Sequence, residues 1–250
     1  ELEGGYTNTY RNYTDKLVVA RDFKADFEYA TYSARIRYRD KNGYKNINLN
    51  YNQSVDLPSV NQLQPVEDVS DITHIRVGNP FLEPEINHSL RFEYQNNLAY
   101  NNINITGNAR AGFVQDKIIN STITDENLNK YTTYDNTNGD YSLSGSVAVS
   151  KSIYNKKTNI NINARFNTSY RNSLSVQNAI KFTAKTTTLR PSFSLRYSYD
   201  NKIDFSGTYS YSTNKSVFDT DAFNDNSYFV QNLKFDTNVF LIKNNTYACA

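Results

Sequence analysis

The sequence of 250 residues contains no tryptophan, no methionine and only one cysteine, Cys249. A single cysteine excludes a disulfide within the chain and any metal site built on paired cysteines. No run of about eighteen apolar residues occurs, which excludes a transmembrane helix. No basic start followed by an apolar stretch marks a secretory signal. Because the chain starts at Glu1 without any methionine, we expect it to be a processed or excised part of a longer protein.

Prolines are also scarce, and four of the five lie between Leu57 and Glu85. Proline lacks the N–H group that a strand interior needs, so this segment is predicted to be a long ordered loop. The fifth proline, Pro191, falls inside an otherwise regular strand pattern. There it removes one ladder hydrogen bond, and we expect a bulge or a local break.

Excess charge of either sign is missing too, since 27 basic and 25 acidic residues give a net charge of +2. This balance gives no case for a nucleic-acid partner. Hydrophobic content of 38% and a mean hydropathy of −0.70 are values typical of a soluble protein. A membrane β-barrel has similar averages, because only every second residue faces lipid. The 21 tyrosines and 14 phenylalanines suit strands and interfacial girdles.

Alternation of apolar and polar residues is the main pattern that is present. Ile47, Leu49 and Tyr51 alternate with a row of asparagines that a dry core would not accept unpaired, so their face must be wet. The same period of two marks strands within 32–39, 86–95, 103–113, 141–149, 160–170, 189–199, 203–211 and 233–241, and a partial strand within 2–10.

Connections between these strands alternate between tight turns and long loops. The predicted turns are 40–43, 96–102, 154–158, 200–202 and 243–245, and the predicted loops are 54–85, 114–140 (with its own hairpin), 171–184 and 213–227. Short turns on one side and long loops on the other are typical of bacterial outer-membrane barrels. The pattern therefore predicts an all-β, antiparallel up-and-down transmembrane β-barrel segment of about nine strands, with a further strand opening at 246–250.

The proline-rich segment carries a motif. It consists of Pro58 and Ser59, then Gln62, Leu63 and Pro65, and then Gly78, Asn79, Pro80, Leu82, Pro84 and Glu85. This order resembles the signature loop of TonB-dependent outer-membrane receptors, especially the Bacteroidetes-type outer-membrane β-barrel family. One position departs from that pattern, because Leu57 stands where the family usually has arginine.

The resemblance implies the barrel part of a TonB-dependent receptor that takes up a nutrient or chelate across the outer membrane of a Gram-negative bacterium. Such barrels have 22 strands and a plugged lumen. Residues 1–250 would then be a single incomplete barrel domain without the plug and the last strands. The implied partners are the lipid bilayer, the remaining strands and plug of the same polypeptide, TonB and a surface lipoprotein.

Two other classes share these features. A barrel with a structural or assembly role but no active uptake would have the same strands, and a soluble all-β adhesin or glycan-binding sandwich would have a similar alternation. Detergent dependence separates the soluble class from the other two.

Candidate functional residues are few. Glu83 and Glu85 flank a proline at a strand mouth, His74 lies in the loop, and His88 shares a face with apolar residues. None has the spacing of a catalytic triad or a metal site, so we expect no enzyme, no metal and no cofactor. Arginines on the predicted wet face could contact an anion, although in a wide barrel contact with water or a plug is the favoured interpretation. These candidate lumen-facing residues are Arg35, Arg37, Arg110, Arg165 and Arg196.

Overall fold

The computed structural model describes residues 2–13, 23–178, 180–200 and 202–239. Ten long strands in this part of the chain form the main sheet: β1 (Leu2–Tyr13), β2 (Phe23–Arg39), β3 (Lys45–Asp56), β6 (Glu85–Leu98), β7 (Ile103–Gln115), β10 (Asp140–Tyr154), β11 (Thr158–Gln177), β12 (Ile180–Tyr199), β13 (Ile203–Phe218) and β14 (Asn226–Val239). Smaller elements lie in the connections: α1 (Val60–Leu63), β4 (Glu67–Asp68), β5 (His74–Val77), η2 (Ala99–Asn101), β8 (Lys117–Thr124) and β9 (Lys130–Thr137).

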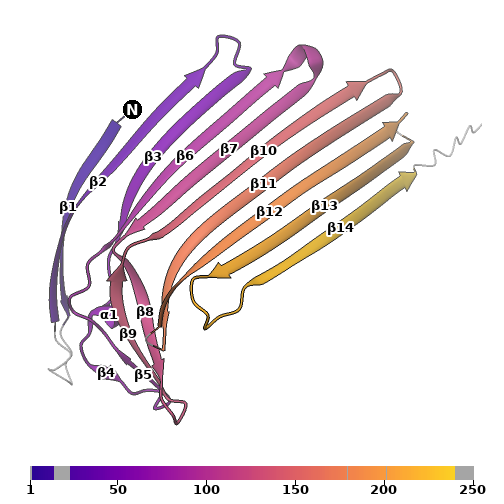
Figure 1. Ribbon diagram of the computed structural model, residues 1–250. Coiled ribbons are helices and arrows are strands. Elements are labelled where there is room, and N and C mark those ends of the chain that lie inside the picture. Colours follow the sequence, from indigo (N-terminus) through magenta and orange to yellow (C-terminus); the bar gives the residue numbers. More distant parts are fainter. Residues whose placement is uncertain (1, 14–22, 179, 201, 240–250) are drawn as a thin grey trace, which may run out of the picture.

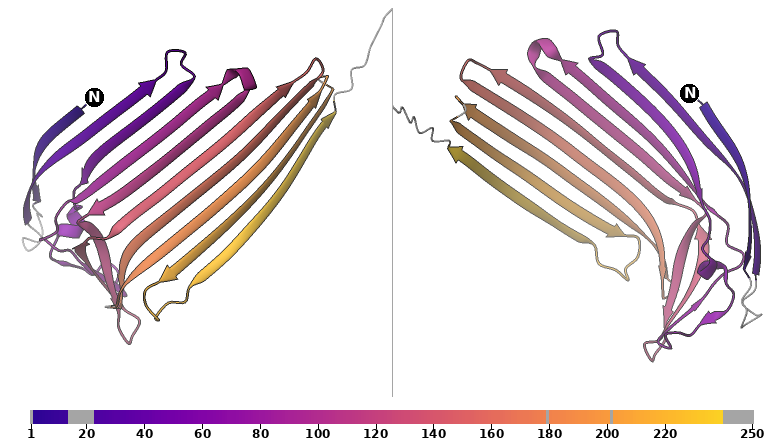
Figure 2. Two further views of the ribbon diagram at one scale, coloured as in Figure 1. Left: turned by 45° about the horizontal axis from the view of Figure 1, so that its top comes forward. Right: turned by 180° about the vertical axis from the view of Figure 1, so that it is seen from behind.

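The long strands lie side by side in chain order as one curved antiparallel sheet (Figure 1). Both views of Figure 2 show the same arc, with the small elements gathered near one end. The prediction of an all-β antiparallel meander is confirmed. The partial strand predicted at 2–10 is a full strand, β1, which pairs with β2 along its whole length. Within the described residues, β1 and β14 each pair with a long strand on one side only.

Register separates the two faces of the sheet. The ladder pairs Ile36 of β2 with Leu49 of β3, and Leu49 in turn with Phe92 of β6, so these three apolar side chains form a row on one face. The adjacent row of the ladder consists of Arg37, Asn48 and Glu93, and its side chains lie on the opposite face. Because side chains alternate along a strand, each row keeps its face across the sheet. We call the surface that contains Ile36 the apolar face and the surface that contains Arg37 the polar face.

Aromatic rings of neighbouring strands meet on the apolar face near the end that carries the long connections. The ring of His88 lies 6.2 Å from that of Tyr51 and 5.9 Å from that of Phe113, and Tyr141 lies 5.9 Å from Tyr170. The Tyr51 hydroxyl is also 2.9 Å from Nδ1 of His88. These rings form an aromatic band like the girdles of membrane barrels. His88 is packed between two of the rings of this band.

The predictions of long loops at 171–184 and 213–227 are wrong. β11 and β12 stay paired as far as Gln177 and Ile180, so most of 171–184 is strand. β13 likewise runs to Phe218, which leaves only 219–225 between β13 and β14. These hairpin ends begin with polar residues on both faces, as at 171–173 and 213–216, which interrupts the period of two in the sequence, although Leu174 and Val176 further on alternate with Ser175 and Gln177. They extend beyond the apolar part of the sheet, and one of them is held by the Phe182 ring 4.5 Å from that of Phe223.

Pro191 interrupts the ladder without a bulge. The pairs Leu189–Thr213 and Ser192–Ser210 keep one register, and the two positions between them are unpaired with β13. On the other side, Pro191 still pairs with Phe166. A local break is therefore present, but no residue is inserted, because the missing N–H removes a bond and does not change the strand length.

The predicted turn at 243–245 and the strand opening at 246–250 lie outside the described residues. The tight turn at 40–43 is confirmed, with Gly43 at a φ of 73° and its N–H donating to the Asp40 carbonyl at 3.1 Å. Neither helix of the described chain is long and apolar enough to span a membrane.

The two faces can be tested with neighbouring residues of β10. Val147 lies on the apolar face and is 54% exposed, whereas Ser146 lies on the polar face and accepts a hydrogen bond from Asn108. We expect Val147→Arg in the full-length protein to cost about 2–4 kcal/mol of folding free energy in lipid vesicles, because its charge enters hydrocarbon. Ser146→Arg should cost about 1 kcal/mol, the value of one hydrogen bond. Urea titrations followed by circular dichroism measure both, and equal costs would contradict the assignment of the faces.

Candidate functional site: the cap and the polar face

Residues 57–84 and the β8–β9 hairpin pack together into a unit that we call the cap, at one end of the sheet (Figure 1). Two short parallel pairings join the cap internally and to the main sheet: β5 pairs with β9, and β8 pairs with the end of β11. The segment predicted to be a loop therefore contains one helical turn and two short strands. Its local structure depends on a hairpin more than 30 residues later in the chain.

The cap has its own small core, which lies against the polar face of the sheet. Leu63 is 0% exposed, Leu82 is 3% exposed, and both pack with Phe27 of β2, which is 7% exposed. Phe27 is on the same side of β2 as Arg35, because the two are separated by an even number of residues. Residues 57–84 are thus folded back against the face that carries the arginines and asparagines.

Ser59 and Gln62 fix the first turn of α1. The backbone N–H and the hydroxyl of Ser59 both donate to Oε1 of Gln62, at 2.8 and 2.9 Å. A glutamine that returns to the residue before a helix is one half of a capping box. Pro58, just before this turn, is fully buried, and Pro65 follows the end of the turn.

Gly78 lies against the backbone of the same turn. Its N–H donates to the Gln64 carbonyl at 2.9 Å, and the next N–H, from Asn79, donates to the Gln62 carbonyl at 2.6 Å. A Cβ atom at Gly78 would be 2.3 Å from the Gln64 oxygen, closer than any real contact. Only glycine fits here, because two backbone segments approach without room for a side chain.

The end of the motif is bound to the β8–β9 hairpin. Asn79 donates through Nδ2 to the Tyr134 carbonyl at 3.0 Å and accepts the Phe81 N–H at 3.0 Å, which closes the turn around Pro80. Glu85 accepts the Ile118 N–H at 2.7 Å. Together with Leu82 in the core and Pro84 before β6, all eleven motif residues take part in building or bounding the cap.

One residue of the cap escaped prediction. Asn136 of β9 accepts the Glu83 N–H at 2.8 Å and returns a hydrogen bond from Nδ2 to the Glu83 carbonyl at 2.9 Å. These two hydrogen bonds satisfy the backbone N–H and carbonyl of Glu83, which lies between Pro80 and Pro84 and has no strand partner. No local signal in the sequence marks Asn136, because its partner lies 53 positions away.

The residues considered for catalysis have structural partners. Nε2 of His74 is 3.0 Å from the Thr132 hydroxyl, and its Nδ1 is 3.3 Å from Arg76. Glu85 makes its cap contact through its carboxylate, whereas Glu83 makes its contacts through its backbone N–H and carbonyl. In the described part of the chain, no group of three histidine, cysteine, aspartate or glutamate residues could hold a metal ion.

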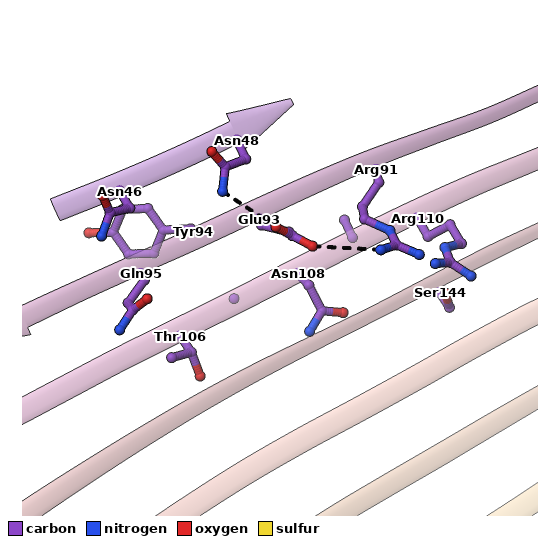
Figure 3. Close-up of a pocket in the computed structure, with 12 residues that line it drawn as sticks. Asn46, Asn48, Arg91, Glu93, Tyr94, Gln95, Thr106, Asn108, Arg110 and Ser144 are labelled. Atoms are coloured by element: carbon purple, nitrogen blue, oxygen red, sulfur yellow. Dashed lines mark hydrogen bonds and ion pairs between the residues drawn. The ribbon is translucent and has the colours of Figure 1, made fainter. Parts of the chain in front are cut away.

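A hollow of about 600 Å³ lies on the polar face across β3, β6, β7 and β10 (Figure 3). Asn48 donates to Glu93 at 3.4 Å, and Arg91 lies 3.8 Å from the same carboxylate. Arg110 and Ser144 close one end of the hollow. Its lining consists of amide, hydroxyl and guanidinium groups with one acid.

The arginines predicted from the sequence share the polar face but do not form one cluster. The Nε atoms of Arg35, Arg37 and the neighbouring Arg39 donate to the side-chain oxygens of Asn50, Asn48 and Asn46, at 2.9, 3.2 and 2.9 Å. Arg110 lines the hollow directly, whereas Arg37 and Arg39 contact it only through Asn48 and Asn46, which line it. Arg165 on β11 and Arg196 on β12 lie on the same face but outside the hollow.

A sheet of long antiparallel strands with one hydrated face and one apolar face that stays uncovered in the described residues, as at Ile36 and Val147, is typical of a class, the proteins that cross a membrane with β-strands. Residues 2–247 match the outer membrane protein beta-barrel family. The chain belongs to this family and is located in the outer membrane of a Gram-negative bacterium, in contact with lipid. The soluble adhesin alternative is therefore wrong. No enzyme family is found for the chain, and no curated protein matches it.

The role of Gly78 gives a prediction. Gly78→Ala should destabilise the cap by about 1–3 kcal/mol, because the methyl group would clash with the Gln64 backbone. The matched control is Gly107→Ala, whose added Cβ would meet nothing closer than 3.8 Å. Limited proteolysis of the detergent-solubilised full-length protein should cut residues 57–84 faster in the first variant only. Unchanged cleavage in both variants would show that the close approach at Gly78 does not hold the cap.

The turn between β8 and β9 gives a pH prediction. Hydrogen bonds from the Asn129 side chain, then from backbone N–H groups, lower the pKa of Asp125 below its ordinary value of 3.8. A lowered pKa means that the turn is stabilised above that ordinary value and loses this support as the pH falls through the lowered value. Exchange protection of the Asn127 and Asn129 amides should drop in that range. Asp125→Asn should remove the pH dependence, and the same drop in this variant would contradict the cause given.

Proposed function

We propose that this chain is the barrel part of a TonB-dependent outer-membrane receptor that takes up a nutrient or a chelate. The supporting observation is that the motif resembling the signature loop of those receptors forms a packed cap over the polar face. The prolines and the glycine of this segment hold it in an inward fold. Such a segment is better suited to controlling access to a lumen than to contacting an external surface. The arginines Arg35, Arg37, Arg110, Arg165 and Arg196 would then face that lumen.

The proposal includes further strands. β1 and β14 each leave one edge without a long-strand partner among the described residues, and a bare N–H or C=O in hydrocarbon costs several kcal/mol. Ten strands with an apolar outer face would pair at both edges with other strands of a barrel of about 22 strands. A plug would occupy the lumen, and TonB and a surface lipoprotein would be partners.

A barrel with a structural or assembly role is the second candidate, because it would share every strand and the same two faces. The presence of a cap packed against one end of the polar face favours the receptor. A barrel that only supports other proteins has no need for an ordered segment folded over its hydrated side.

Growth of the source bacterium tests the proposal. A strain lacking the protein is compared with the wild type on a panel of single carbon sources and iron chelates, each with and without functional TonB. We expect loss of growth on one member of the panel in both mutant strains, since active uptake across the outer membrane needs both proteins. Normal growth of the deletion strain on every member would favour the structural barrel.

Complementation separates the cap from other connections. Replacing residues 78–84 by a glycine–serine segment of the same length should fail to restore growth, because it removes the cap contacts of Gly78, Asn79 and Leu82. The matched control replaces the seven residues 219–225, the whole connection between β13 and β14, in the same way, and it should restore growth because the turn keeps its length. Surface amounts of both variants are measured by immunoblot of outer membranes. Equal restoration by the two variants at equal amounts would count against a role of the cap in uptake.

A further inference from the structure

We infer that the hollow on the polar face binds an oxyanion group of a small hydroxylated solute, with Arg91 and Arg110 as the anion-binding pair. The inference rests on the proposed function and specifies its substrate class: an acidic oligosaccharide that carries carboxylate groups. The site consists of side chains of β3, β6, β7 and β10 and contains no residue of the cap.

The first observation is a pair of like charges. Arg91 of β6 and Arg110 of β7 are direct cross-strand partners on the polar face. Residues in such a pair have Cβ atoms about 4.5–5.5 Å apart, and like charges there are destabilising. Figure 3 shows the two guanidinium groups next to each other at one end of the hollow. An anion bound between them would turn this repulsion into two attractions.

The second observation is the shortage of acid in the hollow. Glu93 is 3.8 Å from Arg91 and also accepts a hydrogen bond from Asn48. Arg110 forms no ion pair with any residue that the structure describes. One half-exposed carboxylate is therefore the only acid that the described residues place beside two guanidinium groups in the hollow, and it pairs with Arg91 alone. Arg37 and Arg39 on β2 add further positive charge to the same side.

The rest of the lining indicates what accompanies the anion. Ser144 pairs with Arg110 across the ladder, and Asn108 stands two residues before Arg110 on the same face. Hydroxyl and amide groups both donate and accept hydrogen bonds, so they suit sugar hydroxyls, while guanidinium groups suit carboxylates in a bidentate geometry. The hollow of about 600 Å³ is in the usual range for small-molecule sites, about 300–1,000 Å³.

Binding is measured by calorimetry on the full-length protein in detergent, with three probes: trigalacturonate, neutral maltotriose of the same length, and inorganic phosphate. We expect Arg91→Gln and Arg110→Gln each to weaken trigalacturonate binding by about 10- to 100-fold, the usual loss of one charge-assisted hydrogen-bonding group. Added salt should weaken binding to the wild type. Arg196→Gln, on the same face but outside the hollow, is the matched control and should bind like the wild type.

A stability measurement distinguishes a binding role from a structural one. Without ligand, Arg110→Gln should raise the denaturant midpoint, because it removes the repulsion from Arg91. Arg110→Lys keeps the charge but loses the bidentate geometry, so it should leave the midpoint near that of the wild type and bind trigalacturonate with intermediate affinity. A purely structural arginine would give the opposite result, a lower midpoint for Arg110→Gln.

Three results would overturn the inference: trigalacturonate binding no tighter than maltotriose binding, equal trigalacturonate affinity in the wild type and both glutamine variants, or a lower midpoint for Arg110→Gln with no anion binding by the wild type. The last result would assign the arginines to an acidic segment of the protein itself. Phosphate binding that also depends on Arg91 and Arg110 would support the oxyanion site and show that the sugar is not required. Binding needs neither TonB nor energy, so this test can fail while the uptake test succeeds, and the reverse.

Discussion

The backbone hydrogen bonds of the long strands are the constraint on which the rest of the structure depends. Hydrocarbon offers no partner for an N–H or C=O group, so a chain that crosses a membrane as strands must pair each strand with its neighbours. The ladders run without a shift from β1 to β14, and even at Pro191 the register is kept on both sides of the break. Once the register is fixed, the alternation of side chains gives one apolar face and one polar face, and every other feature is built on one of these.

The polar face is organised by amide groups and not by packing. Across β2 and β3 each arginine donates from Nε to an asparagine oxygen, so the ladder of guanidinium groups is oriented by a parallel ladder of amides. Such exposed polar pairs contribute little stability each. Their effect is to hold the charges in place on a hydrated surface. Closely packed apolar clusters lie against this face near its ends, in the cap core around Leu63, Leu82 and Phe27 and where the Phe182 ring meets that of Phe223.

The sequence was most informative where one face is buried in lipid. Alternation such as that of Ile47 to Tyr51 located the strands, their order and their two faces, because a period of two is visible whenever the faces differ in polarity. It failed at 171–184 and 213–227, where short stretches with polar residues on both faces, 171–173 and 213–216, interrupt the alternation. The motif located the cap but not its partners: the contact of Glu83 with Asn136 joins residues 53 positions apart, and only the fold brings them together. The pairing of Arg91 with Arg110 was missed for the same reason, since it requires the register of β6 on β7.

The depth of the hollow follows from the strand geometry. Arg91 is six residues along β6 from Glu85, where the strand leaves the cap, and at about 3.4 Å per residue this is about 20 Å. With the tilt of about 40° usual for membrane barrels, the arginine lies about 15 Å below the cap, at a level where the opposite face of β6 exposes the apolar residues Leu90 and Phe92. A guanidinium group at that depth must face water or an anion, because in hydrocarbon it would cost several kcal/mol. Two of them side by side with one acid are best accounted for by a site that is completed by a ligand, and the cap lies between that site and the nearest end of the sheet.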